Sequence, residues 1–67
     1  MAILKVIEIM ASSKSSWEDA AGNAVKEASR TVKGIRSIYV KEQSATVNKG
    51  KIEEYRVITK ISFTIER

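Results

Sequence analysis

The chain has 67 residues, of which 12 are lysine or arginine and 8 are aspartate or glutamate, with a net charge of +4 and neither cysteine nor histidine. This length allows one domain with a small core, and the composition excludes disulfides, thiolate or imidazole catalysis and metal sites built from those ligands. Because small domains without such support usually gain stability from partner subunits, the composition favours a homo-oligomer.

Composition also bears on location and partners. No apolar run approaches the roughly 20 residues of a membrane helix, and the first residues lack the pattern of a signal peptide. We therefore expect a cytoplasmic protein with no membrane partner. Acidic residues are interspersed with the basic ones, which is typical of a mixed solvated surface rather than of a nucleic-acid-binding stripe. No nucleic acid partner is expected either.

The first predicted element is a strand over Ile3–Met10. Branched apolar residues dominate this segment, and only Lys5 and Glu8 interrupt them. Such a pattern is typical of a strand that is buried over much of both faces. The serine-rich segment 11–16 that follows has the composition of a turn.

A helix is predicted to begin at Trp17 and to run to about residue 33. Ser15 and Ser16 each precede an acidic residue by three positions, which gives two overlapping capping boxes. Gly22 costs about 1 kcal/mol of helix propensity unless a close contact requires it, and Gly34 stands where a left-handed C-terminal cap is expected. Small and apolar residues recur at the spacing of one buried stripe: Trp17, Ala20, Ala21, Ala24, Val25, Ala28, Thr31 and Val32.

Two further strands follow the helix. The segment Ile35–Val47 alternates imperfectly, which predicts a strand with a bulge or a strong bend. The segment Asn48–Gly50 has the composition of a three-residue hairpin loop that ends in glycine. From Tyr55 onward the alternation is regular, and one face is expected to be core: Tyr55, Val57, Thr59, Ile61, Phe63 and Ile65.

The expected order is strand, helix, strand, strand, within a single α+β domain that spans residues 1–67. If the third strand lies between the other two and antiparallel to both, the helix makes the crossover that parallel first and second strands require. The result is a three-stranded antiparallel sheet with one helix packed on it. One helix cannot cover both long strands, and two sheet edges stay open, so symmetric neighbours are expected to cover the rest.

No residue pattern predicts catalysis, so we expect that the chain is not an enzyme. The usual general base and thiolate nucleophile are absent, and there is no glycine-rich phosphate loop. The only tryptophan, Trp17, is expected to pack against the loop that leads into the helix or against a neighbouring subunit. Four glutamates carry oxygens that suit a hard cation such as calcium, but nearby lysine or arginine favours solvated surface charge: Glu42, Glu53, Glu54 and Glu66.

The length and the order of these elements resemble those of the dodecins. The matching segments are Lys5–Ile9 in the first strand, Ser12–Trp17 before the alanine-rich helix, Thr31–Val32 at its end, and Tyr55–Phe63 in the last strand. Together with the spacing between them, they extend the resemblance over nearly the whole chain. It implies a β-α-β-β subunit, a hollow homododecamer and, as in many members, a role in flavin storage or scavenging.

The resemblance also implies a ligand site, and this sequence departs from it at two positions. Flavin-binding dodecins stack the isoalloxazine ring on a tryptophan of the second strand, and the matching residue here is Ser37. Their glutamine that hydrogen-bonds the ring is matched by Arg56, while Tyr39 is another aromatic candidate. Because serine cannot stack on a ring, flavin binding is expected to be weakened. The segment is instead similar to dodecins that lack this tryptophan and are associated with calcium or with no ligand.

Two functions stay open on this basis. The first is a dodecin-like shell that binds, stores or buffers a small ligand, either a flavin or a cation, with Ser37, Arg56 and Tyr39 as candidate cofactor-binding residues and the metal ligands unassigned. The alternative is a purely structural or interaction assembly with no small-molecule ligand.

Overall fold

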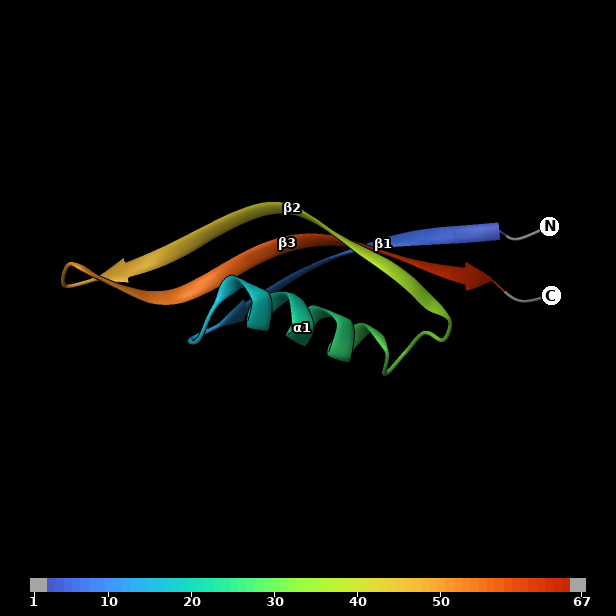
Figure 1. Ribbon diagram of the computed structural model, residues 1–67, viewed down its shortest axis with the longest axis horizontal. Helices are drawn as coiled ribbons and strands as arrows, with labels where there is room; N and C mark the ends of the chain where they lie inside the picture. Colours follow the sequence, from blue (N-terminus) through green and yellow to red (C-terminus); the bar gives the residue numbers. More distant parts are fainter. Residues whose placement is uncertain (1–2, 66–67) are drawn as a thin grey trace.

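The computed structural model describes residues 3–65 and has the predicted element order. Its elements are β1 (Ile3–Ser13), α1 (Trp17–Ala28), β2 (Ile35–Asn48) and β3 (Lys51–Ile65). β3 lies between β1 and β2 and is antiparallel to both. α1 lies along one face of this sheet (Figure 1). The predicted α+β fold is therefore confirmed.

The strand register divides the sheet into two faces. Residues paired across antiparallel strands point to the same side, and successive residues point to opposite sides. The pair Ile7 and Ile61 points toward α1, on what we name the helix face, and the neighbouring pair Val6 and Ser62 points away from it, on the outer face. The fully buried side chains form a thin layer between α1 and the helix face: Ala20, Ala24, Ala28, Val57, Thr59 and Ile61.

Small side chains set the distance between α1 and the sheet. Ala20, Ala24 and Ala28 of the predicted stripe are all buried, and alanine lets the helix backbone approach the strands closely. Thr59 of β3 is buried in the same layer, and its Oγ1 donates a hydrogen bond to the carbonyl of Ile9 at 2.8 Å. This bond satisfies a hydroxyl whose burial without a partner would cost about 1–3 kcal/mol.

α1 begins after Ser16, which confirms one of the two predicted capping boxes in part. The Oγ of Ser16 accepts a hydrogen bond from the backbone N–H of Asp19 at 2.9 Å. The Asp19 carboxylate accepts a bond from the Oγ of Ser13 at 2.6 Å, and so joins the start of the helix to the end of β1. The N–H of Ser15 donates to the same Ser13 hydroxyl, so Ser15 is not the cap. β1 pairs with β3 as far as Ser13, so it ends three residues later than the predicted Met10.

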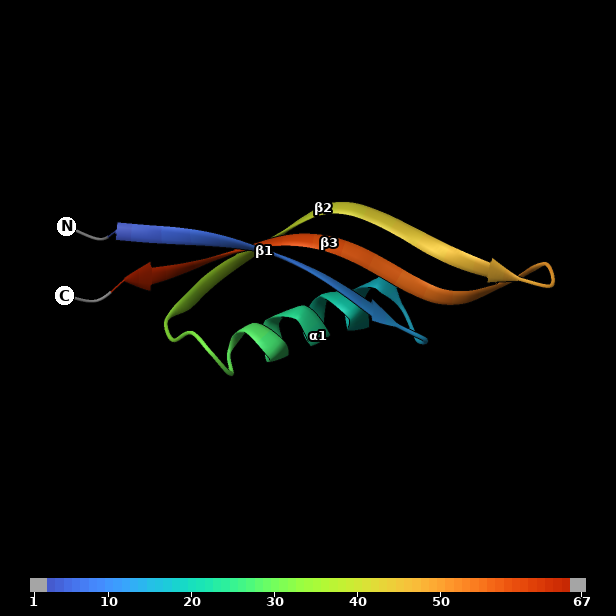
Figure 2. The ribbon, with the colours of Figure 1, turned by 180° about the vertical axis from the view of Figure 1, so that it is seen from behind.

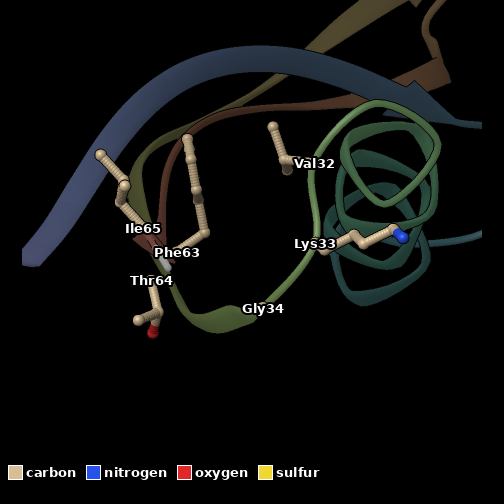
Figure 3. Close-up of a pocket in the computed structure, with 6 residues that line it drawn as sticks. All are labelled: Val32, Lys33, Gly34, Phe63, Thr64 and Ile65. Atoms are coloured by element: carbon tan, nitrogen blue, oxygen red, sulfur yellow. The ribbon is translucent and has the colours of Figure 1, made fainter. Parts of the chain in front are cut away.

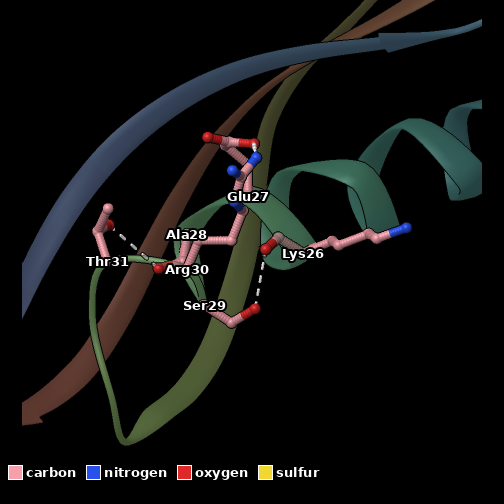
Figure 4. Close-up of polar contacts among 6 residues, drawn as sticks. All are labelled: Lys26, Glu27, Ala28, Ser29, Arg30 and Thr31. Carbon is pink, nitrogen blue, oxygen red and sulfur yellow. Dashed lines mark hydrogen bonds and ion pairs between the residues drawn. The ribbon is translucent and has the colours of Figure 1, made fainter.

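α1 ends at Ala28, about one turn earlier than the sequence pattern predicted. The Oγ of Ser29 donates to the carbonyl of Lys26 at 2.8 Å, and the Oγ1 of Thr31 donates to that of Ala28 at 3.3 Å (Figure 4). Such side-chain bonds satisfy the last carbonyls of the helix and compete with its continuation. Gly34 does have a positive φ of 76°, but it lies well beyond Ala28 and leads into β2 instead of capping α1.

The hairpin between β2 and β3 turns over two residues rather than the three predicted. Asn48 and Lys51 form its last cross-strand pair. Between them, Lys49 and Gly50 have positive φ angles of 54° and 78°. Positive φ at both turn positions matches the right-handed twist of the flanking strands. The predicted bulge in the second strand is confirmed, because the register of β2 shifts at three places.

The predicted burial of the first strand on both faces is wrong for the single subunit. Ile7 and Ile9 pack against the core, but Val6 and Met10 on the outer face are 56% and 58% exposed. The β2–β3 hairpin also projects beyond the start of α1 (Figures 1 and 2). The 12 residues of α1 span about 18 Å, whereas the 15 residues of β3 span about 50 Å. The helix therefore covers only part of the sheet, as the sequence predicted.

Candidate functional site

The three predicted cofactor-binding residues all lie on the outer face of the sheet but at different points along it. Ser37 pairs with Ser62, and Tyr39 pairs with Lys60. Arg56 lies six residues from Ser62 along β3, which corresponds to about 20 Å. Within one subunit, Ser37 and Arg56 are therefore too far apart to hold the same ring. A site that uses both positions has to combine residues of two subunits.

Ser37 lines an open pocket of about 450 Å³ with mixed polar and apolar walls, together with Leu4, Arg36, Ser62 and Thr64. The Oγ atoms of Ser37 and Ser62 share a hydrogen bond of 2.6 Å. Among the residues that the structure describes, no aromatic side chain lines this pocket. A flavin ring placed here would meet hydroxyl groups instead of an aromatic face, and would lose the roughly 0.5–1.5 kcal/mol that stacking adds to area burial.

Arg56 belongs to a separate and smaller pocket of about 200 Å³. Its Nη2 donates a weak hydrogen bond to the Sδ of Met10 at 3.6 Å. Glu54 lines the same pocket, so the local charge is mixed. Tyr39 is 64% exposed and lines neither this pocket nor that of Ser37. The fold of one subunit thus places the three residues on one face without bringing them together.

The glutamates considered as cation ligands do not converge within the subunit. Glu42 pairs with Ile58, and Glu54 lies four residues from Ile58 along β3, or about 14 Å. Glu53 is exposed beside Glu54, and Glu66 lies outside the described residues. Within residues 3–65, no group of three or more potential metal ligands lies close together. A cation site built from these carboxylates therefore needs more than one subunit.

The structure gives Trp17 a role that the sequence did not reveal. Its Nε1 donates a hydrogen bond to the carbonyl of Ser44 at 2.9 Å. Its ring meets that of Tyr55 edge-on, with centroids 4.7 Å apart. Trp17 thereby joins the start of α1 to β2 and β3 of its own subunit, two contacts that the sequence did not predict. Its packing against the loop before the helix or against a neighbouring subunit stays a prediction. Only the order of the strands brings these distant residues together.

A larger pocket of about 520 Å³ lies beyond the C-terminal end of α1. In it, the side chains of Phe63 and Ile65 point to one side of β3, and Thr64 points to the opposite side (Figure 3). Lys33 points away from Phe63 and Val32. The pocket therefore lacks the convergent polar groups that position a small ligand. We regard the outer-face pocket at Ser37 as the stronger candidate site.

The length and apolarity of α1 bear on the expected absence of a membrane partner. Over residues 3–65, the structure contains no helix that is long and apolar enough to cross a membrane.

Comparison with known proteins identifies relatives over nearly the whole chain. The family model described as Dodecin matches residues 3–66. The calcium dodecin of Mycobacterium tuberculosis is 40% identical over 63 residues, which cover 94% of this chain and 89% of that protein.

Solved structures support the same likeness. The crystal structure of the calcium-chelating calcium dodecin of Mycobacterium tuberculosis, which is described as having a novel calcium-binding site, matches with a TM-score of 0.82 and 42% identity. The match covers 96% of this chain and 91% of that chain. A dodecin variant of Thermus thermophilus matches with a TM-score of 0.94 and 25% identity over 100% of both chains. The β-α-β-β subunit is therefore the fold of these proteins.

Proposed function

The chain belongs to the dodecin family, and from this we propose that it forms a shell that holds a hard cation such as calcium between its subunits and binds flavins only weakly. Dodecins assemble as homododecamers, so every outer-face residue is present in many symmetric copies. The shell stores or buffers its ligand without transforming it, because the chain has neither histidine nor cysteine for acid–base or nucleophilic catalysis.

The expected weakness of flavin binding rests on one observation at Ser37. Ser37 stands at the position where the family resemblance places a stacking tryptophan, and its hydroxyl is hydrogen-bonded to that of Ser62. If two symmetric copies of that position face one ligand, the stacking free energy is lost twice. We therefore expect riboflavin to bind at least about tenfold more weakly than to a dodecin that has the tryptophan.

Calcium is supported by the relative that shares 40% identity and is named for that ion. Calcium takes about six to eight oxygen ligands, which is more than the described carboxylates of one subunit bring together. Glu42 and Glu54 belong to the outer face and are not in an ion pair with another described residue. We propose that such carboxylates meet their symmetry mates in the shell and supply charged oxygens to the ion.

Calorimetric titration of the shell tests this proposal, after dialysis against a chelator and a metal analysis of the dialysed protein. We expect saturable calcium binding and a weaker response to magnesium, because magnesium demands stricter geometry. Glu42→Gln and Glu54→Gln are compared with Glu27→Gln, a control on the helix that is paired with Arg30. Absence of calcium binding at millimolar concentration, or equal binding by all three variants, would refute the assignment.

A shell without a small-molecule ligand is the second candidate. It is favoured by two observations on the described residues: no group of three or more potential metal ligands lies close together, and no aromatic side chain lines the pocket at Ser37. If this function holds, the purified protein has neither flavin absorbance nor bound metal, and neither ligand raises its melting temperature.

A further inference from the structure

A β-bulge at the start of β2 changes the direction of one charged side chain. Ile35 pairs with Phe63 and Ser37 pairs with Ser62, so Arg36 is an extra residue between two pairs that are adjacent on β3. In a regular strand, consecutive side chains point to opposite faces. A bulge breaks this alternation and can redirect a side chain. Here, as a consequence, Arg36 and Ser37 line the same outer-face pocket.

The other walls of this pocket add hydroxyl groups. Ser62 and Thr64 both belong to the outer face of β3, and the Oγ of Ser62 lies 2.6 Å from that of Ser37. Figure 3 shows Thr64 directed to the opposite side of β3 from Phe63. Arg36, Ser37, Ser62 and Thr64, from two neighbouring strands, therefore line an open space of about 450 Å³, and Leu4 of β1 adds to its apolar surface.

The positive charge of Arg36 favours an anionic ligand in this pocket. Among the described residues that line it there is no carboxylate, and within residues 3–65 no salt bridge engages Arg36. A guanidinium can donate two parallel hydrogen bonds to phosphate oxygens, and hydroxyls can donate further ones. We infer that this pocket binds the phosphate group of a small organic phosphate, an inference that rests on the small-ligand role of the shell proposed above.

The position of Arg36 distinguishes this pocket from the site first considered at Arg56. Arg56 shares its pocket with Glu54, and that carboxylate would repel a phosphate. The Arg36 pocket has no such neighbour among its described lining residues. It also has room for more than a phosphate ion, since small-ligand pockets commonly measure about 300–1,000 Å³.

Riboflavin and flavin mononucleotide provide a matched pair of probes, because they share a ring and a ribityl chain and differ by one phosphate group. Fluorescence titration of the intact shell should show the mononucleotide binding at least about tenfold more tightly, since a charge-assisted hydrogen bond contributes at least that factor. Inorganic phosphate at millimolar concentration should compete with it. Arg36→Gln should remove the preference, and Ser62→Ala should reduce it.

Arg30→Gln is the matched control, because Arg30 follows α1 and is paired with Glu27, and it should keep the preference of the wild type. Sedimentation of each variant shows whether the shell is intact. If Arg36→Gln does not assemble, the test uses Ser62→Ala instead, which should assemble and show a reduced preference for the mononucleotide over riboflavin. A mononucleotide that fails to bind the wild type at millimolar concentration, or a preference that survives the deciding variant, overturns the inference. Loss of calcium binding alone would refute only the proposed function.

Discussion

Ser37 sits on the outer face with its hydroxyl 2.6 Å from that of Ser62. This contact uses the O–H of one serine and leaves that of the other free to donate, and no aromatic side chain is among the described residues that line the pocket. The same residue therefore excludes ring stacking and contributes to a polar environment. Substitution of Ser37 is the most direct way to separate the loss of ring stacking from the polarity that its hydroxyl adds.

Ser37→Trp should raise the affinity for riboflavin at least about tenfold, because it restores a stacking surface in each symmetric copy. Quenching of riboflavin fluorescence measures the change. Gln43→Trp is a suitable control, since Gln43 is an exposed residue of the same strand that pairs with Val57 and so belongs to the opposite face of the sheet. Equal quenching by both variants would show that the position of the tryptophan does not matter.

Adding Arg56→Gln to Ser37→Trp tests whether two subunits share the site. The two residues lie about 20 Å apart in one chain, so a further gain in affinity can arise only where positions from different subunits meet. We expect this gain in the assembled shell. Affinities of the single and double variants that agree within error would place Arg56 outside the flavin site.

At the scale of elements, α1 is held to the sheet by an alanine stripe and fixed at each end by hydroxyl groups. Its opposite side includes Gly22, which is exposed, and apart from the neighbouring residues and backbone of α1 itself, a Cβ added there would meet no atom within 4 Å. The sequence left open whether a close contact requires this glycine. Within one subunit none does, so its low helix propensity is not offset by packing.

Gly22→Ala should therefore stabilise the protein by roughly 0.5–1 kcal/mol per subunit. Urea unfolding at a fixed protein concentration measures this shift, because the stability of an oligomer depends on concentration. Ala24→Leu provides the contrast: Ala24 is 0% exposed, and overpacking a filled core costs about 1–3 kcal/mol. A destabilising Gly22→Ala would indicate that another subunit packs against this side of α1.

The whole subunit is too extended to be a self-sufficient fold. Its accessible surface of 5194 Å² exceeds the roughly 4,200 Å² expected for a compact monomer of 7.5 kDa. Its radius of gyration is 13.7 Å, against about 11 Å for a compact chain of 67 residues. Apolar side chains remain exposed on the outer face of β1, among them Leu4, Val6 and Met10. These features favour the assembly that the family forms.

Analytical ultracentrifugation should show one species at the mass of a homododecamer of the 7.5 kDa subunit. Because assembly covers apolar surface, the melting temperature should rise with protein concentration until assembly is complete. Replacing Val6 by glutamate adds a charge to an exposed outer-face position and should shift the distribution toward smaller species. A stable wild-type monomer at micromolar concentration would contradict this account of the subunit's stability.

The sequence by itself determined the element order, a helix start within the two overlapping capping boxes of Ser15 and Ser16, the alanine stripe and the core face of β3. These features depend on local capping chemistry and on periodicity, which neighbouring residues encode directly. The resemblance, likewise carried by local segments, indicated the family. The same resemblance pointed to Ser37 and Arg56 as candidate binding positions, and their roles in binding stay predictions.

Only the tertiary structure decided which distant residues meet. It placed Ser62 against Ser37, directed Arg36 into their pocket through a bulge, and brought Trp17 to Tyr55. These contacts depend on strand register, and a shift of one residue in register turns every side chain to the other face. The end of α1 at Ala28 was likewise decided by hydroxyl bonds to its last carbonyls, because helix periodicity alone continues through residues that side-chain bonding removes from the helix.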